Sequence, residues 1–254
     1  MTSTTATSRV AVVTGGAAGI GLAIAERLAK DGFRIAILDV VDGAAEQAAE
    51  AIGGVGGHAR GYRADVSDRQ QVDAVLAAAR AELGPLAAVV ANAAIARQRP
   101  FLDMTPDDWN RTLSINLTGT FHVVQSALPD LIDAGWGRVV LISSSSAQRG
   151  APKMAHYAAS KGGQLALTKA LAVEFARSGI TVNSVAPSSI DTPSVQKKRA
   201  TGAIPSAEDM AKYIPVGRTG TGEDIAAAVS YLVSDEASYV TGQTVSVNGG
   251  SFIG

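Results

Sequence analysis

Residues 9–21 read R-V-A-V-V-T-G-G-A-A-G-I-G, and this stretch decides the fold. The apolar run at its start is typical of a short strand that is buried on both faces. Glycines at positions 15, 19 and 21 allow the backbone to turn tightly and to approach a ligand, and an amphipathic helix is expected to follow to about Lys30. The N-terminus of such a helix is suited to hold a pyrophosphate. A plain strand-to-helix turn with spare glycines is the alternative.

The same rhythm of strand and helix continues along the chain. Six further strands are predicted, at 34–38, 59–63, 86–91, 138–143, 181–185 and 244–247. Helices are predicted at 68–83, 105–133, 155–177 and 222–234. This alternation favours an α/β fold: a single-domain, Rossmann-type, doubly wound parallel sheet of seven strands with helices on both faces. We expect residues 1–254 to form one dinucleotide-binding and catalytic domain, in which the irregular, mixed-charge stretch 188–213 is a mobile substrate flap.

Polar residues and a glycine follow the first four predicted strands. Gly15 follows the first strand, Asp39 the second, Asp65 the third and Asn92 the fourth. Ligands of such sheets bind at the carboxyl ends of the strands, so we expect these residues around one crevice. An acid at position 39 suits the paired hydroxyls of an adenosine ribose and repels a 2′-phosphate. The glycine loop carries no lysine or arginine, so the sequence favours NAD over NADP. An Asp39 that caps the next helix is the alternative.

The composition excludes several classes of function. Hydrophobic residues make up 46% of the 254 residues and charged residues 18%, which excludes disorder and fits a large buried sheet. With 22 basic and 23 acidic side chains, nothing suggests nucleic acid or an anionic membrane as a partner. The absence of cysteine removes disulfides, thiol catalysis and thiolate metal sites. Residues Met1–Ser8 lack the apolar core of a secretory signal and no run approaches a membrane span, so a cytoplasmic protein is expected.

The stretch 154–161, M-A-H-Y-A-A-S-K, holds the best candidates for reacting groups. Tyr157 and Lys161 stand four residues apart in an Ala-rich run that is expected to be helical, so both project from one face. A lysine ammonium beside a tyrosine favours the phenolate, and we therefore expect the pKa of Tyr157 to move from about 10 toward neutrality. Such a phenol gives or takes a proton readily. A solvated helix face is the alternative for this pair.

With these residues placed, the chain resembles the short-chain dehydrogenase/reductase family of the single-domain type, over almost its full length. The matching motifs are T-G-G-A-A-G-I-G at 14–21, D-V at 65–66, N-A-A at 92–94, N at 116, I-S-S at 142–144, Y-A-A-S-K at 157–161 and V-N-S-V-A-P at 182–187. Some positions depart from the family's usual pattern. Ala91 and Ala94 stand in place of an asparagine and a glycine, Ser188 follows Pro187 where glycine is usual, and Asn248 stands where aspartate is frequent.

The resemblance implies a catalytic set of four residues. Tyr157 would be the acid/base, and Lys161 would bind the nicotinamide ribose and lower the pKa of the tyrosine. Ser144 would hold the substrate oxygen, and Asn116 would hold a water that links Lys161 to solvent. The residues expected to contact NAD are Gly15, Ala18, Gly19, Ile20, Gly21, Asp39, Asp65, Val66, Asn92, Ala93, Tyr157, Lys161, Pro187, Ile190 and Thr192. The family also implies a homotetramer, built by pairing the Asn116 helix and the Tyr157 helix with their copies.

Three functions stay open at this stage. The leading hypothesis is hydride transfer between NAD(H) and a secondary alcohol or ketone, with Tyr157 as acid/base. The second narrows the substrate to 3-oxoacyl thioesters on an acyl carrier protein or CoA. Relatives of that kind usually use NADP and carry basic residues near the positions of Gly135 and Ser178, which this chain lacks. The third is a non-catalytic NAD-sensing scaffold, although such proteins often lose the tyrosine or the lysine.

Other polar residues bear on the substrate or on metals. Four basic residues are expected near the mouth of the site, where they would attract an anionic substrate: Arg97, Arg99, Arg149 and Lys153. The three histidines include no pair at metal-ligand spacing, so no metal is expected. His122 is expected to be a core or interface residue with satisfied hydrogen bonds. His156 adjoins Tyr157 but is expected to face about 100° away from it on a helix.

Overall fold

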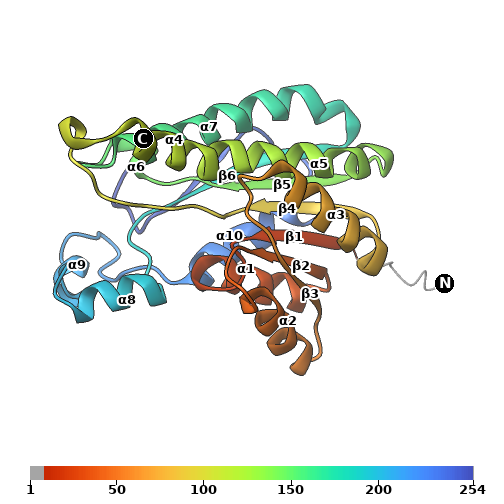
Figure 1. The fold of residues 1–254 in the computed structure, drawn as a ribbon, viewed down its shortest axis with the longest axis horizontal. Coiled ribbons are helices and arrows are strands. Elements are labelled where there is room, and N and C mark those ends of the chain that lie inside the picture. Colours follow the sequence, from red (N-terminus) through yellow and green to blue (C-terminus); the bar gives the residue numbers. More distant parts are fainter. Residues whose placement is uncertain (1–8, 254) are drawn as a thin grey trace.

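The structure is a computed structural model that describes residues 9–253, so the stretch Met1–Ser8 and its predicted lack of a secretory signal lie outside it. Within this range one sheet has the strand order β3-β2-β1-β4-β5-β6-β7, and every neighbouring pair is parallel (Figure 1). The strands are β1 (Val10–Thr14), β2 (Arg34–Asp39), β3 (His58–Arg63), β4 (Leu86–Ala91), β5 (Gly137–Ile142), β6 (Ile180–Pro187) and β7 (Thr244–Val247). The predicted seven-stranded, doubly wound α/β fold is confirmed.

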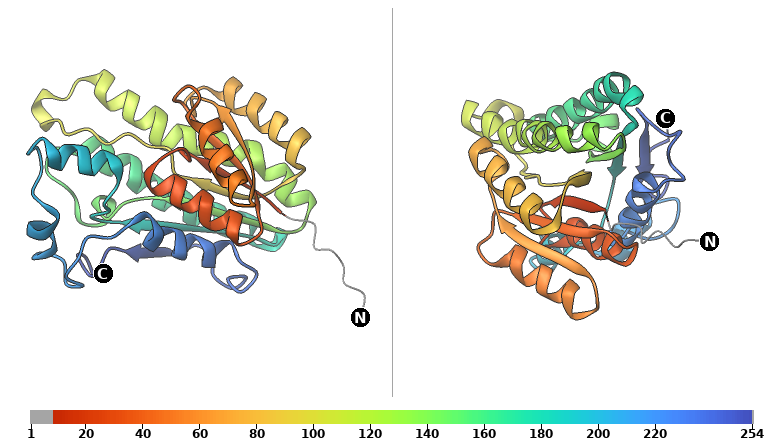
Figure 2. Two further views of the ribbon diagram at one scale, coloured as in Figure 1. Left: turned by 90° about the horizontal axis from the view of Figure 1, so that it is seen from below. Right: turned by 90° about the vertical axis from the view of Figure 1, so that its right-hand side faces the viewer.

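Helices cover both faces of the sheet (Figure 2). One face carries α1 (Gly19–Lys30), α2 (Ala44–Gly54) and α10 (Gly222–Val233). The other carries α3 (Arg69–Leu83), α5 (Gly119–Asp133) and α7 (Ala155–Phe175). The shorter segments are η1 (Phe101–Asp103), α4 (Pro106–Leu113), η2 (Ser114–Thr118), α6 (Ser146–Arg149), η3 (Ala176–Ser178), α8 (Pro193–Ala200) and α9 (Ala207–Ala211).

Each face of the sheet has its own apolar core. Leu28 of α1 and Ile225 of α10 are fully buried on the first face, and Leu76 of α3 and Leu131 of α5 are fully buried on the second. Because both faces are covered, β1, β4, β5 and β6 are buried along their whole length, as the apolar runs of β1 and β4 predict. None of the helices in the described range is long and apolar enough to cross a membrane.

The strand order positions the ligand crevice. β1 pairs with β2 on one side and with β4 on the other, so the chain winds outward in opposite directions from this point. The loops that leave the carboxyl ends of β1 and β4 therefore diverge and leave an opening between them. Gly15, Asp39 and Asn92 all follow or end these central strands, and they lie around that opening.

Two predicted segments differ from the expected form. The helix predicted at 105–133 is divided, because the π turn η2 joins α4 to α5 around Asn116. The start of this helix is as expected, since Thr105 and Asp108 form a reciprocal capping box. The stretch 188–213 contains the short helices α8 and α9, which its mixed charge and lack of period did not indicate.

Candidate active site

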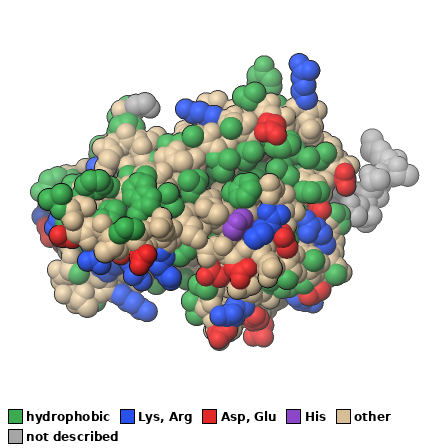
Figure 3. Space-filling view, turned by 45° about the horizontal axis from the view of Figure 1, so that its top comes forward, with side chains coloured by type: hydrophobic (Ala, Val, Ile, Leu, Met, Phe, Trp, Pro, Cys, Tyr) green, Lys and Arg blue, Asp and Glu red, His purple; other side chains and the backbone are tan. Residues whose placement is uncertain are grey.

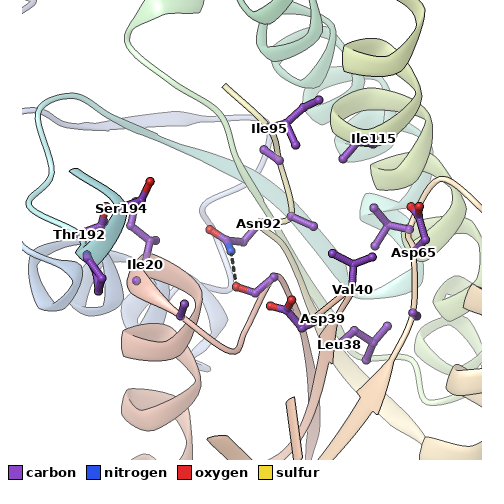
Figure 4. A pocket seen from close by; sticks show the side chains of 18 of the residues that line it. Ile20, Leu38, Asp39, Val40, Asp65, Asn92, Ile95, Ile115, Thr192 and Ser194 are labelled. Atoms are coloured by element: carbon purple, nitrogen blue, oxygen red, sulfur yellow. Dashed lines mark hydrogen bonds between the residues drawn. The ribbon is translucent and has the colours of Figure 1, made fainter. Parts of the chain in front are cut away.

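A crevice opens at the carboxyl edge of the sheet, where β1, β2 and β4 end (Figure 4). Ten of the predicted cofactor contacts line it: Gly15, Ala18, Gly19, Ile20, Asp39, Asp65, Val66, Asn92, Ala93 and Thr192. Pro187 and Ile190 instead line an adjoining pocket, together with Tyr157 and Lys161. Ile20, Asn92 and Thr192 line both, so the two spaces are continuous. The chain therefore offers a long site with the glycine loop near one end and the tyrosine at the other.

The glycine loop has a conformation that its glycines make possible. Gly15 and Gly19 have φ angles of +60° and +56°, in the left-handed region that favours glycine. Gly21 lies behind the loop, and a Cβ added there would stand 2.0 Å from the Gly15 carbonyl oxygen. The same Cβ would stand 2.7 Å from Nδ2 of Asn92. Gly21 is thus required for close packing of the loop on α1, whereas Gly15 and Gly19 face the crevice.

Asn92 and Thr14 tie the glycine loop to β4. Nδ2 of Asn92 donates to the carbonyl oxygen of Gly15 at 3.1 Å (Figure 4), and also to that of Thr14 at 3.0 Å. Oγ1 of Thr14 accepts from the backbone N–H groups of Asn92 and Ala93, both at 3.0 Å. The prediction of cofactor contacts included Asn92 but not Thr14. The threonine forms the opposite half of this link, and its position immediately before the glycines was the available signal.

The Asp39 carboxylate lies at the tip of β2 and faces the crevice (Figure 4). Its two oxygens accept from the backbone N–H of Ala17 at 3.2 Å and of Val41 at 3.1 Å. It therefore braces the glycine loop while remaining available to a ligand. The alternative that Asp39 caps the next helix is wrong, because the N-cap of α2 is Gly43.

The adjoining pocket collects the other predicted catalytic side chains. Ser144, Tyr157 and Lys161 line it from the end of β5 and from α7. The neighbouring serines act differently. Ser143 is buried, and its hydroxyl donates to the main-chain oxygen of Lys161 at 3.0 Å, which ties β5 to α7. Ser143 and Ser146 line the pocket as well, and the backbone N–H of Ser146 donates to Oγ of Ser144 at 3.1 Å.

Lys161 is fully enclosed. Its Nζ donates to the carbonyl oxygen of Ile142 at 2.6 Å and to Oε1 of Gln164 at 3.2 Å. Nζ also lies 5.9 Å from the centre of the Tyr157 ring. Burial lowers the pKa of Lys161 from its ordinary value to about 7.

The expected fall in the pKa of Tyr157 is wrong for this structure. Burial raises the pKa of the Tyr157 phenol above its ordinary value, and a hydrogen bond with Ser144 offsets part of that rise. Lys161 is not among the causes of this shift in pKa; its ammonium bonds to the Ile142 carbonyl and to Gln164, and Nζ lies 5.9 Å from the ring centre. The sequence showed that the two residues share a helix face, but not where the ammonium points. Tyr157 is therefore held as a neutral phenol at pH 7.

Asn116 is fully buried in the π turn between α4 and α5. Its Oδ1 accepts from the N–H of Ile95 at 2.8 Å, and its Nδ2 donates to the Ile95 carbonyl and to Oγ of Ser160, both at 3.0 Å. The side chain thus joins the loop after β4 to α7. Its main-chain oxygen accepts from two side chains, Thr120 and Gln164. No predicted role covered Gln164.

Comparison with known proteins agrees with this arrangement. A family model described as enoyl-(acyl carrier protein) reductase matches residues 15–251. The acetoacetyl-CoA reductase of Shinella zoogloeoides is 41% identical over 248 residues, which cover 96% of this chain and 99% of that protein. The 3-oxoacyl-(acyl-carrier-protein) reductase FabG of Salmonella typhimurium is 36% identical over 245 residues, which cover 96% of this chain and 98% of that protein. The chain belongs to the short-chain dehydrogenase/reductase family.

A solved member of the family has the same fold. A variant of the actinorhodin polyketide ketoreductase, determined with NADPH, superposes with a TM-score of 0.92 at 32% identity, covering 96% of this chain and 97% of that one. Like its family, this dehydrogenase/reductase binds a nicotinamide dinucleotide. Its own residues fit that group: positive-φ glycines open the loop between β1 and α1, and Asp39 faces the crevice at the tip of the next strand.

One of the basic residues predicted near the mouth of the site lines the pocket of this dehydrogenase/reductase, and another has a different partner. Of the four basic residues predicted at the mouth, Arg149 lines the pocket, while the Arg99 guanidinium pairs with Asp108 at 3.2 Å. Lys198 and Arg199 of α8 line it as well, although no helix was predicted at the position of α8. The stretch 188–213 packs close to the glycine loop, since a Cβ on Gly19 would contact Thr192 at 3.4 Å.

Two of the three histidines, His122 and His156, can be compared with their predicted roles. His122 bonds through Nδ1 with the carbonyl oxygen of Val66 at 3.0 Å, as expected for a satisfied residue. His156 is buried and is not among the residues that line the pocket of Tyr157. Its orientation away from that pocket agrees with the helical angle predicted between neighbours.

Proposed function

We propose that this protein moves a hydride between NAD(H) and a secondary alcohol or ketone, with Tyr157 as the acid/base. The carrying observation is that Ser144, Tyr157 and Lys161 line one pocket that opens into the dinucleotide crevice. The cofactor, when bound, supplies or accepts the hydride. The protein's part is to hold the substrate oxygen and to exchange its proton. The intact tyrosine and lysine argue against the non-catalytic scaffold.

The roles of the side chains follow from their surroundings. In reduction, the phenol O–H of Tyr157 gives its proton to the carbonyl oxygen, while the Ser144 hydroxyl donates a hydrogen bond to the same oxygen. In oxidation, the alcohol proton returns to Tyr157. Lys161 is the candidate for the ribose contact, and Asn116 is the candidate for holding a water that links Lys161 to solvent.

A substrate panel tests this function. Purified protein would be assayed with NADH and NADPH against ketones, and with the oxidised cofactors against secondary alcohols, by nicotinamide absorbance. Turnover that depends on Tyr157 is the expected result. Lack of turnover across the panel, with cofactor bound, would argue for the scaffold hypothesis.

We infer that NAD is preferred to NADP. The support is the Asp39 carboxylate in the crevice, which would repel a 2′-phosphate. Among the described residues that line this crevice, Arg111 supplies the single positive charge, and it comes from α4 rather than from the loops that follow β1 and β2. NAD is expected to bind at least about tenfold more tightly, or about 1.4 kcal/mol. Calorimetric titration of both cofactors measures this, and equal affinities would contradict it.

A second candidate substrate is a 3-oxoacyl thioester. The observation in its favour is that Arg149 and Lys198 line the pocket beside Tyr157 and would attract the phosphates of a CoA or carrier-protein arm, whereas the Arg199 guanidinium pairs with Asp191. Two of the relatives are named for acetoacetyl-CoA and for 3-oxoacyl groups on acyl carrier protein. Comparing kcat/KM for acetoacetyl-CoA with that for a free 3-oxo ester distinguishes the two substrates. Lys198→Ala should lower only the value for the CoA substrate.

The expected organisation of the chain also stays a proposal. We propose one domain over residues 1–254, a substrate flap at 188–213, a homotetramer and a cytoplasmic setting. Figure 3 shows hydrophobic side chains gathered on the face of α4, α5 and α7. An apolar groove lies there between α5 and α7, and the exposed Phe121 lines it. Pairing of these helices with their copies would cover the groove. A monomeric mass by light scattering at micromolar concentration would refute the tetramer.

A further inference from the structure

Gln164 occupies a position between two of the proposed catalytic residues. It follows Lys161 by three residues on α7 and is fully buried. Its Oε1 accepts from Nζ of Lys161 at 3.2 Å. Its Nε2 donates to the main-chain oxygen of Asn116 and to Oγ1 of Thr120, each at 2.8 Å. One buried amide thus joins the lysine to the π turn across the space between α7 and α5.

The partners fix the orientation of this amide. A lysine ammonium only donates hydrogen bonds, so the group facing Nζ has to be the amide oxygen. A carbonyl only accepts, so the group facing Asn116 has to be the amide nitrogen. Thr120 donates its own proton to the Asn116 oxygen at 2.8 Å, which leaves its lone pairs to accept from Gln164. Both polar atoms of the Gln164 side chain are therefore hydrogen-bonded, and only one orientation of the amide satisfies all of these partners.

The main-chain oxygen of Asn116 receives two side-chain hydrogen bonds in this arrangement. It accepts from the Thr120 hydroxyl and from the Gln164 amide. The family resemblance led us to expect that Asn116 holds a water linked to Lys161, and that water stays a prediction. The Gln164 amide joins the same turn to Lys161 through protein atoms.

We propose that Gln164 is a positioning residue for Lys161, which ties the lysine ammonium to the Asn116 turn through its buried amide. The proposal rests on the proposed function, in which Lys161 acts together with Tyr157.

Few charged groups surround Lys161, so the effect of Gln164 on the pKa of this lysine can be measured. Tyr157 faces Nζ from the same helix, β5 presents the neutral Ile142 carbonyl, and the π turn presents neutral groups alone among its described contacts. The cationic residues that line the same pocket are Arg149, Lys198 and Arg199. Burial, and not a neighbouring charge, accounts for the lowered pKa of the lysine. Removing a neutral acceptor should therefore move the titration of Lys161 directly.

The test measures the protonation of Lys161 by NMR in enzyme labelled at the lysine ε carbon. The signal is assigned by its loss in Lys161→Met. Gln164→Met keeps the volume and removes the acceptor, and hydrogen bonds to charged groups shift such equilibria by roughly tenfold to a hundredfold. We expect the pKa of Lys161 to fall by about one to two units. Gln164→Glu keeps the shape and adds a negative charge, so there the pKa should rise by at least about one unit.

Thr168→Val is the matched control. Thr168 is equally buried on α7, and its hydroxyl donates to the main-chain oxygen of Gln164 at 2.8 Å without a hydrogen bond to Lys161. This variant should lose stability but leave the Lys161 titration unchanged. A wild-type titration in Gln164→Met or in Gln164→Glu would overturn the proposal, and the second variant serves if the first does not fold. The readout needs no substrate, so its failure is distinct from failure of the proposed function, which turnover in Tyr157→Phe tests.

Discussion

Replacement of Gly21 by alanine should distort the dinucleotide site, because Gly21 lies behind the glycine loop and packs against it. The added Cβ would stand 2.0 Å from the Gly15 oxygen and 2.7 Å from Nδ2 of Asn92, whereas ordinary contact begins near 3.4 Å. The Gly15 oxygen accepts a hydrogen bond from Nδ2 of Asn92, so these two groups have to move together. The glycine loop therefore has to shift by about 1 Å or more. Such overpacking costs about 1–3 kcal/mol.

The helical position of Gly21 offsets part of that cost. Alanine is favoured over glycine in a helix by about 0.5–1 kcal/mol, so the net loss of stability should be at most about 2.5 kcal/mol, with a middle value near 1 kcal/mol. For a chain of this size a loss of about 1 kcal/mol lowers Tm by roughly 2–4 °C. Because the displaced loop carries Gly15 and Ala18 of the crevice lining, affinity for the dinucleotide should fall at least about tenfold, or about 1.4 kcal/mol.

Thermal unfolding without cofactor and calorimetric titration with NAD and NADP measure the two effects of Gly21→Ala. The control is Gly53→Ala, on α2 of the same face, where an added Cβ meets nothing within 4 Å. That variant should gain about 0.5–1 kcal/mol of stability through helix propensity and keep its cofactor affinity. A Gly21→Ala protein with wild-type Tm and wild-type affinity would refute this reasoning.

Three other predictions concern the reacting groups and the cofactor. Tyr157→Phe should lose all but a few per cent of turnover on the best substrate while binding NAD nearly as wild type does, because the variant lacks only the hydroxyl; higher residual turnover would show that the acid/base is another group. Asp39→Ala should narrow the gap between NAD and NADP affinities in a calorimetric comparison, and an unchanged ratio would remove the carboxylate as its cause. Burial lowers the pKa of Lys161 to about 7, so between pH 7 and about 10 the unfolded chain binds a proton at this lysine that the folded chain does not. The stability of the fold therefore rises with pH in this window. The stability of wild type relative to Lys161→Met, from denaturant unfolding, should therefore grow by about 2 kcal/mol from pH 7.5 to 9.5, and a constant difference would contradict the buried, neutralised lysine.

The sequence alone was sufficient for the fold and for most of the crevice lining. Continuous apolar strands, each followed by a glycine, an acid or an asparagine, are local patterns, and parallel strands bring their carboxyl ends to one edge. The positions of Gly15, Asp39 and Asn92 around the crevice follow from that geometry. The stretch 188–213 was less predictable, because short helices such as α8 have weak periodicity of their own and form against the rest of the chain.

The tertiary structure decided where hydrogen bonds and charges point within the site. Lys161 and Tyr157 share a helix face, as their spacing predicts, yet the ammonium bonds to the Ile142 carbonyl and to Gln164 and does not lower the tyrosine pKa. The bond between Gln164 and the Asn116 carbonyl joins residues 48 positions apart, through a π turn that no local pattern revealed. Periodicity reports which face of a helix is buried, because it depends on neighbours in the chain. The partner of a buried polar atom depends on which helix packs against that face, and only the folded chain determines this.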